Sequence, residues 1–377
     1  MIEKKRTVAV GMSGGVDSSL AAALLQEQGF TVIGLTMKIY GGELTSLKSG
    51  GHACYGPGEE EDIEMTAAVA DHLGIPLHVI DLHTEYREHV LKHFTREYLA
   101  GRTPNPCTRC NPQLKFGFLL EKARATGITF DHFATGHYVR ISHDEQRGRL
   151  VLKKARDPRK DQSYFLYALP PALLEQLMFP LGEMNKDDVR KLAHDCKLPV
   201  SARPESQDFI EGGAYDGLFN PADIKPGPII DSSGSKLGEH RGIIHYTIGQ
   251  RRGIGIAHSE PLYVTGIDTR RNAVVVGPQC DLFSRGLRAT ELHLLSTDRL
   301  HPGQAVQARI RNGHSPAPAT IKVCEKDTIT IMFDQPQMSV TPGQAVVLYD
   351  DDIVLGGAVI EEPLINTSPR SETEQDC

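Results

Sequence analysis

The segment that decides the fold reads Val8-Ala9-Val10-Gly11-Met12-Ser13-Gly14-Gly15-Val16-Asp17-Ser18-Ser19. An apolar run typical of a β-strand leads into a turn of serine and glycine, and the alanine- and leucine-rich run 20–28 predicts a helix. In such a unit the loop N–H groups and the positive end of the helix dipole form an anion site. The glycines let the backbone approach a phosphate closely, and the serines add hydroxyl donors. The lysine of a Walker loop is absent, and a purely structural turn rarely has this composition.

The composition is typical of a globular protein. A chain of 377 residues is longer than a domain with one hydrophobic core usually is, so we expect two or three domains. No apolar run approaches the roughly 18–20 residues of a membrane span. Residues 1–6 lead directly into the first strand, so we expect no signal or transit peptide. Seven cysteines without a regular framework are typical of reduced thiols, and we expect a cytoplasmic protein. The net charge of −7 alone argues against nucleic-acid binding, but the acidic residues are concentrated in a few places, so local patches decide the question.

Strands and helices alternate from the first strand to about residue 205. The predicted strands are 31–37, 77–80 and 130–134, the predicted helices are 62–73, 85–100 and 114–125, and 101–111 is a predicted loop. This alternation predicts an α/β fold with a doubly wound parallel sheet. Ligands of such a sheet bind beyond the carboxyl ends of its strands, at the switch point. The loop 13–19 follows the first strand, which is where a nucleotide is expected.

After residue 205, short β-rich runs separated by glycine and proline replace the helical pattern, which predicts two small β domains, the last a barrel. The predicted domains are an α/β catalytic domain (1–205), a central β domain (206–280), a C-terminal β-barrel (281–365) and a disordered tail (366–377).

The string Ser-Gly-Gly-x-Asp-Ser-Ser at 13–19 matches the signature of the PP-loop ATP pyrophosphatases, which cut ATP between the α and β phosphates and transfer AMP. Six further strings, in order, resemble one family of that superfamily, the tRNA-specific 2-thiouridylases: Gly34–Lys38, Cys110–Phe116, Ala134–Arg140, Asp161–Leu166, Pro204–Asp208 and Tyr246–Gly253. The resemblance spans residues 7 to about 360. It implies that ATP adenylates the C2 carbonyl oxygen of the wobble uridine in tRNAs for Lys, Glu and Gln, and that sulfur then displaces AMP.

The resemblance also implies which residues bind ATP. They are Gly11, Met12, Ser13, Gly14, Gly15, Val16, Asp17, Ser18 and Ser19 in the loop, and Met37 and Gly136 at the adenosine. By its residue type, Asp17 is the only carboxylate of the loop and fits a Mg²⁺ contact, although an aspartate here also fits a turn or helix cap. Without the resemblance, Met37 reads as a core residue.

Cys110 matches the family's catalytic cysteine, and its place before a predicted helix led us to expect a lowered thiol pKa. The chain departs from the family pattern twice. Cys107 stands where the family has a proposed acid/base aspartate. The family's persulfide cysteine follows the Glu-Ser-Gln-Asp string within two residues, and this chain has no cysteine there after 205–208. The usual two-cysteine route is therefore in question.

Cys196 does not stand at the spacing of the missing cysteine. The predicted α/β domain also contains Cys54, Cys107 and Cys110, and four interpretations of these three stay open. A Cys-x-x-Cys pair plus one distant cysteine can hold a 4Fe–4S cluster by three irons, leaving the fourth open to sulfide. The alternatives are a Zn²⁺ site, a redox-active dithiol in which Cys107 carries the persulfide, and three unrelated thiols.

The segment 137–160 contains eight basic and three acidic residues, an electrostatic footprint for RNA within an acidic protein, or else a solvated hairpin. The resemblance implies tRNA contacts at His137, Lys160, Asp161, Gln162 and Gln344, and Arg311 lies in a further basic string. The expected partners are the tRNA anticodon stem-loop, whose uridine must leave its stack, and a sulfur donor, either sulfide or a carrier protein.

These observations predict an ATP-dependent tRNA wobble-uridine thiolase, a tRNA-uridine 2-sulfurtransferase that uses Mg²⁺. Two alternatives stay open: another PP-loop adenylating ligase acting on a small molecule, and a tRNA-binding protein that has lost catalysis. A small-molecule ligase would need neither Cys107 and Cys110 nor the basic segment.

Overall fold

The computed structural model describes residues 6–44, 53–204, 209–210 and 215–364. The chain divides into two compact units. Unit 1 comprises Met1–Lys92, Pro106–Leu218 and Asp352–Val354, and unit 2 comprises His93–Asn105, Phe219–Asp351 and Leu355–Cys377.

A five-stranded parallel sheet with the order β3-β2-β1-β4-β7 forms the centre of unit 1. Its strands are β1 (Thr7–Gly11), β2 (Thr31–Lys38), β3 (Leu77–Asp81), β4 (His132–Thr135) and β7 (Leu177–Met178). The chain passes from β1 to β2 on one side and later adds β4 on the other, so the strand order reverses between β1 and β4. The predicted doubly wound parallel sheet is confirmed, and its switch point lies directly after β1.

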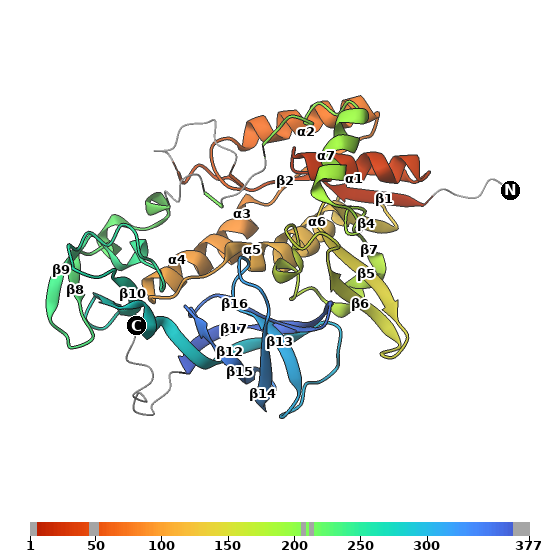
Figure 1. Ribbon diagram of the computed structural model, residues 1–377. Coiled ribbons are helices and arrows are strands. Elements are labelled where there is room, and N and C mark those ends of the chain that lie inside the picture. Colours follow the sequence, from red (N-terminus) through yellow and green to blue (C-terminus); the bar gives the residue numbers. More distant parts are fainter. Residues whose placement is uncertain (1–5, 45–52, 205–208, 211–214, 365–377) are drawn as a thin grey trace. The chain divides into compact units, whose positions relative to one another are not determined.

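Helices cover both faces of this sheet (Figure 1). On one face, α1 (Val16–Glu27), α2 (Glu59–Leu73) and α7 (Lys186–Asp195) share an apolar core with β1 and β2. On the other face lies α6 (Leu119–Ala125), and Phe116 just before it packs edge-on against Phe133 of β4. Unit 1 also contains α3 (His83–Tyr86), α5 (Pro106–Arg109) and a hairpin of β5 (Val139–Asp144) and β6 (Arg149–Lys154), and α4 (Lys92–Leu99) begins at its boundary.

The predicted loop 101–111 is wrong in its second half, because the chain is helical from Pro106 onward. α5 continues as a π-helical segment, Cys110–Phe118, and then as α6. Proline is well suited to the first position of a helix, where its missing N–H has no helical partner. The helix therefore begins eight residues before the predicted start at Leu114, and both cysteines of the Cys-x-x-Cys pair lie on it.

Unit 2 contains a small mixed sheet and an antiparallel barrel. The small mixed sheet has the order β10-β11-β8-β9, with β8 (Gly227–Ile230), β9 (Lys236–His240), β10 (Tyr263–Asp268) and β11 (Ala273–Gly277). The other six strands are β12 (Phe283–Leu294), β13 (Ala305–Arg309), β14 (Ala317–Cys324), β15 (Thr328–Met338), β16 (Ala345–Asp350) and β17 (Ile353–Leu364). β12 pairs with both β15 and β17, which closes a barrel. In β15, Ile329, Ile331 and Phe333 alternate into the barrel core as period-2 strands require. The predicted terminal barrel is confirmed.

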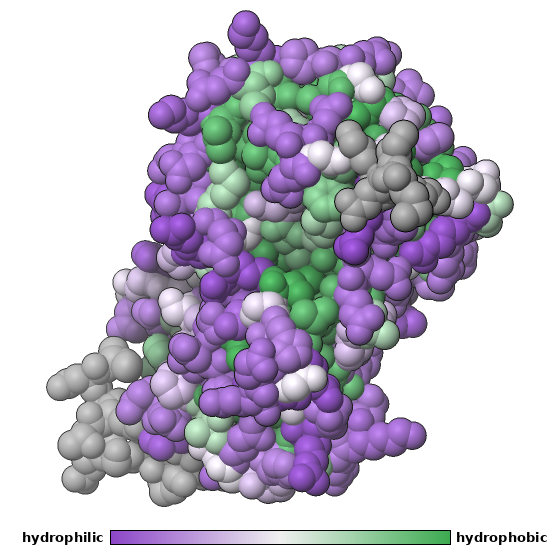
Figure 2. All heavy atoms as spheres, turned by 90° about the vertical axis from the view of Figure 1, so that its right-hand side faces the viewer, coloured by the Kyte–Doolittle hydropathy of each residue, from purple (hydrophilic) through white to green (hydrophobic). Residues whose placement is uncertain are grey.

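Among the described residues, no helix is both long and apolar enough to cross a membrane. Hydrophilic side chains occupy most of the outline of the face drawn in Figure 2, and hydrophobic ones gather toward its middle. The predicted disorder of residues 366–377 concerns a segment outside the described residues.

Candidate active site

The loop after β1 forms a backbone cradle at the start of α1. Gly14 has a φ of +69°, which side-chain-bearing residues rarely adopt, and a Cβ there would lie 2.7 Å from the carbonyl oxygen of Asp62. Gly15 is the N-cap of α1, and the first helical hydrogen bond runs from the Ser19 N–H to the Gly15 carbonyl (3.3 Å). The N–H groups of Val16 to Ser18 therefore precede the helical ladder and can be offered to an anion.

The serine hydroxyls of this loop stabilise its present shape. Ser18 Oγ accepts a hydrogen bond from the Ser13 N–H (3.2 Å), and the Ser19 hydroxyl donates to the Gly15 carbonyl (2.8 Å). Ser18 and Ser19 are buried, whereas Ser13 is exposed at the mouth of the loop. Of the three hydroxyls predicted to contact phosphate, Ser13 is thus the one that solvent reaches most easily.

The loop after β4 closes against this cradle. A Cβ on Gly136 would lie 2.6 Å from both the Asp17 carbonyl carbon and the Ser18 nitrogen, so no larger residue fits here without movement. Met37 is half-buried near the carboxyl end of β2. Met12, by contrast, is buried, and its N–H bonds to the Leu35 carbonyl (2.8 Å). Met12 therefore contributes backbone to the loop and side chain to the core.

Asp17 holds a buried ion pair that the sequence did not reveal. The Lys186 ammonium at the first residue of α7 donates to Asp17 Oδ1 (2.6 Å), and the Tyr138 hydroxyl donates to the same oxygen (2.8 Å). Lys186 is 5% exposed, and its ammonium lies 5.6 Å from the centroid of the Tyr138 ring. Lysines are almost never buried without a partner, but no sequence pattern distinguishes such a lysine from a surface one.

Arg203 is a second basic residue of the loop that the sequence did not reveal. Its guanidinium donates to the Gly14 carbonyl (2.8 Å) and pairs with Asp62 of α2. It directly precedes the Pro204–Asp208 string, whose residues 205–208 lie outside the described part of the chain. The arginine therefore holds the Gly14 carbonyl of the cradle in place and connects it to α2.

Three of the cysteines of unit 1, namely Cys54, Cys107 and Cys110, lie in one neighbourhood. Cys107 is in α5, Cys110 begins the π-helical segment, and Cys54 precedes α2. Burial raises the pKa of the Cys107 thiol to about 12, and the neighbouring Cys54 and Cys110 add to this increase. Burial also raises the pKa of Cys110 to about 11, although the Lys115 ammonium opposes the change. The predicted lowering of the Cys110 pKa is wrong, because the helix begins at Pro106 and burial outweighs the helix end.

A buried phenol adjoins the thiols. Tyr86 is 2% exposed and stacks on the Tyr55 ring with a centroid separation of 5.1 Å. Burial, followed by the proximity of Cys110, Cys54 and Cys107, raises the Tyr86 pKa well above its ordinary range, so its hydroxyl stays protonated. Among the described residues, no three His, Cys, Asp or Glu side chains are arranged to hold a metal ion. The cysteines thus share an environment, but the described side chains around them do not form a metal-binding arrangement.

His137 is buried beside β4. Its Nδ1 lies 2.7 Å from the Thr135 hydroxyl, and its ring packs near Phe116. Burial, helped by Lys115, lowers the pKa of His137 well below its ordinary value, so the imidazole is neutral at physiological pH. Lys115, which the sequence analysis did not single out, therefore influences both Cys110 and His137.

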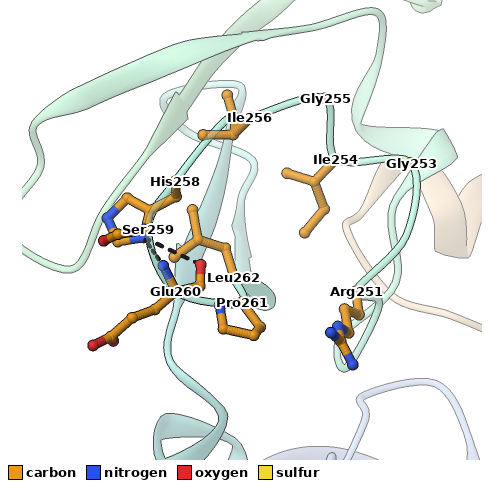
Figure 3. A pocket seen from close by; sticks show the side chains of 10 residues that line it. All are labelled: Arg251, Gly253, Ile254, Gly255, Ile256, His258, Ser259, Glu260, Pro261 and Leu262. Atoms are coloured by element: carbon orange, nitrogen blue, oxygen red, sulfur yellow. Dashed lines mark hydrogen bonds between the residues drawn. The ribbon is translucent and has the colours of Figure 1, made fainter.

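Each unit also has a surface hollow. In unit 1, a cavity is lined by Arg159, Lys160, Lys186, Asp187, Arg190, Ala202 and Pro204. In unit 2, the loop 251–262 curls around a second hollow, in which the Glu260 N–H donates to His258 Nδ1 (3.2 Å) and Arg251 stands at the opposite rim (Figure 3). Gly253 and Gly255 both have positive φ, which allows the loop to curl.

Comparison with known proteins identifies the family. The tRNA methyl transferase HUP domain model matches residues 6–211, the tRNA methyl transferase PRC-barrel domain model 219–278 and the aminomethyltransferase beta-barrel domain model 284–360. The tRNA-specific 2-thiouridylase MnmA 2 of Thermoanaerobacter sp. (strain X514) is 46% identical over 368 residues, 96% of this chain and 100% of that protein. The tRNA-specific 2-thiouridylase MnmA of Endomicrobium trichonymphae is 45% identical over 364 residues, 95% of this chain and 100% of that protein. This chain belongs to the tRNA-specific 2-thiouridylase family.

The resemblance expected from the sequence is thereby confirmed. A solved structure, the NMN synthetase of Francisella tularensis, is 14% identical and covers 55% of this chain and 69% of its own, with a TM-score of 0.33. A score this low carries no functional argument.

The predicted tRNA contacts, which the family resemblance implies except for Arg311 of a basic string, divide between the two units. In unit 1, Asp161 Oδ1 accepts from the Ala155 N–H (3.0 Å), and Gln162 Oε1 accepts from the Tyr138 N–H (2.9 Å), so both stabilise their own loop. In unit 2, Arg311 donates to the Ile248 carbonyl (2.8 Å), and Gln344 donates to the Thr103 carbonyl (2.6 Å). Their role in RNA binding stays a prediction.

The basic segment 137–160 is more neutralised than its sequence indicates. Arg140 and Lys153 both pair with Asp352, at 2.9 and 3.5 Å. Arg147 pairs with Asp144 (2.8 Å), and Arg159 pairs with the buried Asp157 (3.1 Å). Counting the charged residues of 137–160 could not reveal this neutralisation, because Asp352 lies nearly two hundred residues later in the chain.

Proposed function

We propose that this protein is an ATP-dependent tRNA-uridine 2-sulfurtransferase that converts the wobble uridine of tRNAs for Lys, Glu and Gln to 2-thiouridine. The observation that carries the proposal is that unit 1 combines a backbone cradle at the sheet's switch point with a half-buried Cys107/Cys110 pair on one helix. The names of the relatives, tRNA-specific 2-thiouridylases matched over nearly the whole chain, support the same reaction. A small-molecule ligase has no comparable support.

In the first step, the uridine C2 carbonyl oxygen attacks the α-phosphorus of ATP, an adenylated oxygen forms, and pyrophosphate leaves. In this proposal the N–H groups at the start of α1, helped by the Lys186 ammonium bound to Asp17, would stabilise the charge on the β and γ phosphates. Mg²⁺, which would be held by Asp17 and the phosphates, supplies further charge neutralisation. Adenylation matters because it turns a poor oxygen leaving group into AMP.

In the second step, sulfur replaces AMP through the two helix cysteines. A sulfur donor, sulfide with an oxidant or a persulfide-bearing carrier protein, leaves a persulfide on Cys107. The terminal sulfur attacks C2, and AMP departs with the former carbonyl oxygen. The Cys110 thiolate then attacks Cys107 Sγ, which breaks the sulfur–sulfur bond, releases 2-thiouridine and leaves a Cys107–Cys110 disulfide. A thiol reductant restores both thiols.

A 4Fe–4S cluster is the alternative interpretation of the same thiols. Cys54, Cys107 and Cys110 would hold it, and it would supply an open iron site for sulfide. The two routes differ in their need for Cys54. The dithiol route requires only the pair on the helix, whereas a three-cysteine cluster loses a ligand when Cys54 is replaced.

The experiment incubates anaerobically prepared protein with ATP, Mg²⁺, sulfide and unmodified tRNA, with or without a persulfide donor, and measures AMP and 2-thiouridine. We expect both products from the wild type and no 2-thiouridine from Cys110→Ser. Cys196→Ser, which removes a half-buried thiol elsewhere in unit 1, is the matched control and should retain activity. AMP release that is independent of tRNA, without thiouridine, would favour a ligase.

Cys54→Ala and an iron and sulfide assay separate the sulfur routes. The dithiol route predicts retained thiolation by Cys54→Ala and a Cys107–Cys110 disulfide after one turnover without reductant, detectable by mass spectrometry. Stoichiometric iron in the wild type, lost together with activity in Cys54→Ala, would establish the cluster instead.

A further inference from the structure

Cys54 is the exposed member of the group formed by Cys54, Cys107 and Cys110. It lies in the loop before α2, whereas Cys107 and Cys110 are half-buried on the helix that begins at Pro106. The other cysteines in the part of the chain that the structure describes are half-buried as well. Access is one of the factors that set the rate of thiol exchange, so a sulfur donor reaches Cys54 more easily than it reaches Cys107.

The residue after Cys54 fixes this exposed thiol in place. Tyr55 is 1% exposed, its N–H donates to the Phe209 carbonyl (3.0 Å), and its hydroxyl donates to Glu43. Its ring also packs edge-on against Tyr40, with a centroid separation of 5.3 Å. The backbone at Cys54 is therefore tied to a buried aromatic cluster although its side chain faces solvent.

The same cluster leads from Cys54 to the thiols on the helix. The Tyr55 ring stacks on Tyr86, whose pKa is raised by burial and then by all three thiols. After burial, the largest contribution to the raised pKa of Cys107 comes from Cys54, ahead of that from Cys110 on its own helix. Charge interactions decline with separation, so Cys54 and Cys107 are close neighbours, one exposed and one half-buried.

We propose that Cys54 is the entry thiol for sulfur, which accepts a sulfur atom from a persulfide donor and passes it to Cys107. The Cys54 thiolate attacks the outer sulfur of the donor's persulfide, the donor leaves as a thiolate, and Cys54 becomes a persulfide. The Cys107 thiolate then attacks the outer sulfur on Cys54, the sulfur–sulfur bond at Cys54 breaks, and the Cys54 thiolate leaves. Both steps are thiol–persulfide exchanges, so they consume no oxidant or reductant. This role rests on the proposed function for the use of the sulfur that arrives on Cys107.

The relay raises the local concentration of transferable sulfur at Cys107. A group held beside its reaction partner has an effective concentration on the order of 1 mM. Direct loading of Cys107 from solution therefore matches the relay only when the donor reaches about 1 mM, and it is about tenfold slower at about 0.1 mM. Because direct loading stays possible at high donor concentration, the relay is compatible with the retained thiolation that the dithiol route predicts for Cys54→Ala.

The test follows sulfur on each cysteine of the reduced full-length protein, without ATP or tRNA. Glutathione persulfide is the donor, the reaction is quenched with iodoacetamide, and peptides are identified by mass spectrometry. In the wild type we expect sulfur first on Cys54 and then on Cys107, as its persulfide or as the Cys107–Cys110 disulfide that follows from it. Cys54→Ser should load Cys107 about tenfold more slowly at about 0.1 mM donor and approach the wild-type rate at about 1 mM. Cys196→Ser, the matched control, should load Cys107 as the wild type does.

The dependence on donor concentration separates a relay from damage to the fold. A Cys54→Ser protein that stays slow at every donor concentration would assign the loss to structure and overturn the proposal. Equal loading of Cys107 in Cys54→Ser and Cys196→Ser also overturns it, as does sulfur that stays on Cys54 after the donor is removed. Sulfur that passes from Cys54 to Cys107 in a protein that makes no thiouridine would instead refute the proposed function and leave the relay standing.

Discussion

Gly136→Ala tests whether the loop after β4 positions the phosphate cradle. The new Cβ would lie 2.6 Å from the Asp17 carbonyl carbon and the Ser18 nitrogen, whereas ordinary contact begins at 3.4 Å, so about 0.8 Å must open between the two segments. Both neighbours are backbone atoms in the first turn of α1, so no side chain can rotate to make room. The buried leucines Leu20 and Leu25 hold the rest of α1 in the core. We therefore expect the backbone of the cradle to shift rather than the whole helix.

We expect a selective loss of adenylation. Displacements of about 1 Å at a reacting group reduce rates by about a hundredfold, and we expect that reduction in tRNA-dependent AMP formation. Overpacking of this kind lowers the free energy of unfolding by about 1–3 kcal/mol, which leaves the fold intact. The assay is AMP release as a function of ATP concentration, accompanied by far-UV circular dichroism and urea unfolding.

Gly313→Ala is the matched control. A Cβ there meets no atom within 4 Å and its φ is not positive, so AMP formation and stability should stay at wild-type values. A folded Gly136→Ala protein with wild-type kcat and KM for ATP would refute the reasoning, because it would mean that the two loops can separate without moving the nucleotide.

Two further predictions concern charges. Because the pKa of Cys110 is about 11, its alkylation by iodoacetamide should accelerate about tenfold per pH unit between pH 7 and 9. Lys115→Gln should slow alkylation at each pH, since the ammonium lowers that pKa; an unchanged profile would contradict this. The pKa of Asp157 is lowered to about 2, first by its hydrogen bond to the Arg159 side chain and then by the Lys186 N–H. A depressed folded pKa stabilises the protein above the unfolded value and loses effect as pH falls toward 2. Asp157→Asn should therefore lower the free energy of unfolding by about 2 kcal/mol at pH 7, and the difference from wild type in urea unfolding should shrink at pH 3.

The predictions from sequence that the structure confirms concern elements whose formation follows from the local pattern of residues. Apolar runs alternating with helices allowed the parallel sheet to be predicted, and short β-rich runs separated by glycine and proline allowed the terminal barrel to be predicted. The start of the cysteine helix was missed because Pro106 and Cys107 looked like loop residues. The Cys110 pKa was predicted with the wrong sign because a helix end is visible in sequence, whereas burial is not.

Three features can be recognised in the amino-acid sequence alone: a glycine and serine loop after a strand, a Cys-x-x-Cys pair, and the order of the family's motifs. Each of these depends on residues that are neighbours in the chain. Only the tertiary structure decided which distant side chains complete them. Lys186 reaches Asp17 across 169 positions, and Arg203 reaches Gly14 across 189. The physical reason is that burial and charge pairing depend on proximity in space, which the sheet creates by bringing the start of α1, the loop after β4 and the start of α7 together.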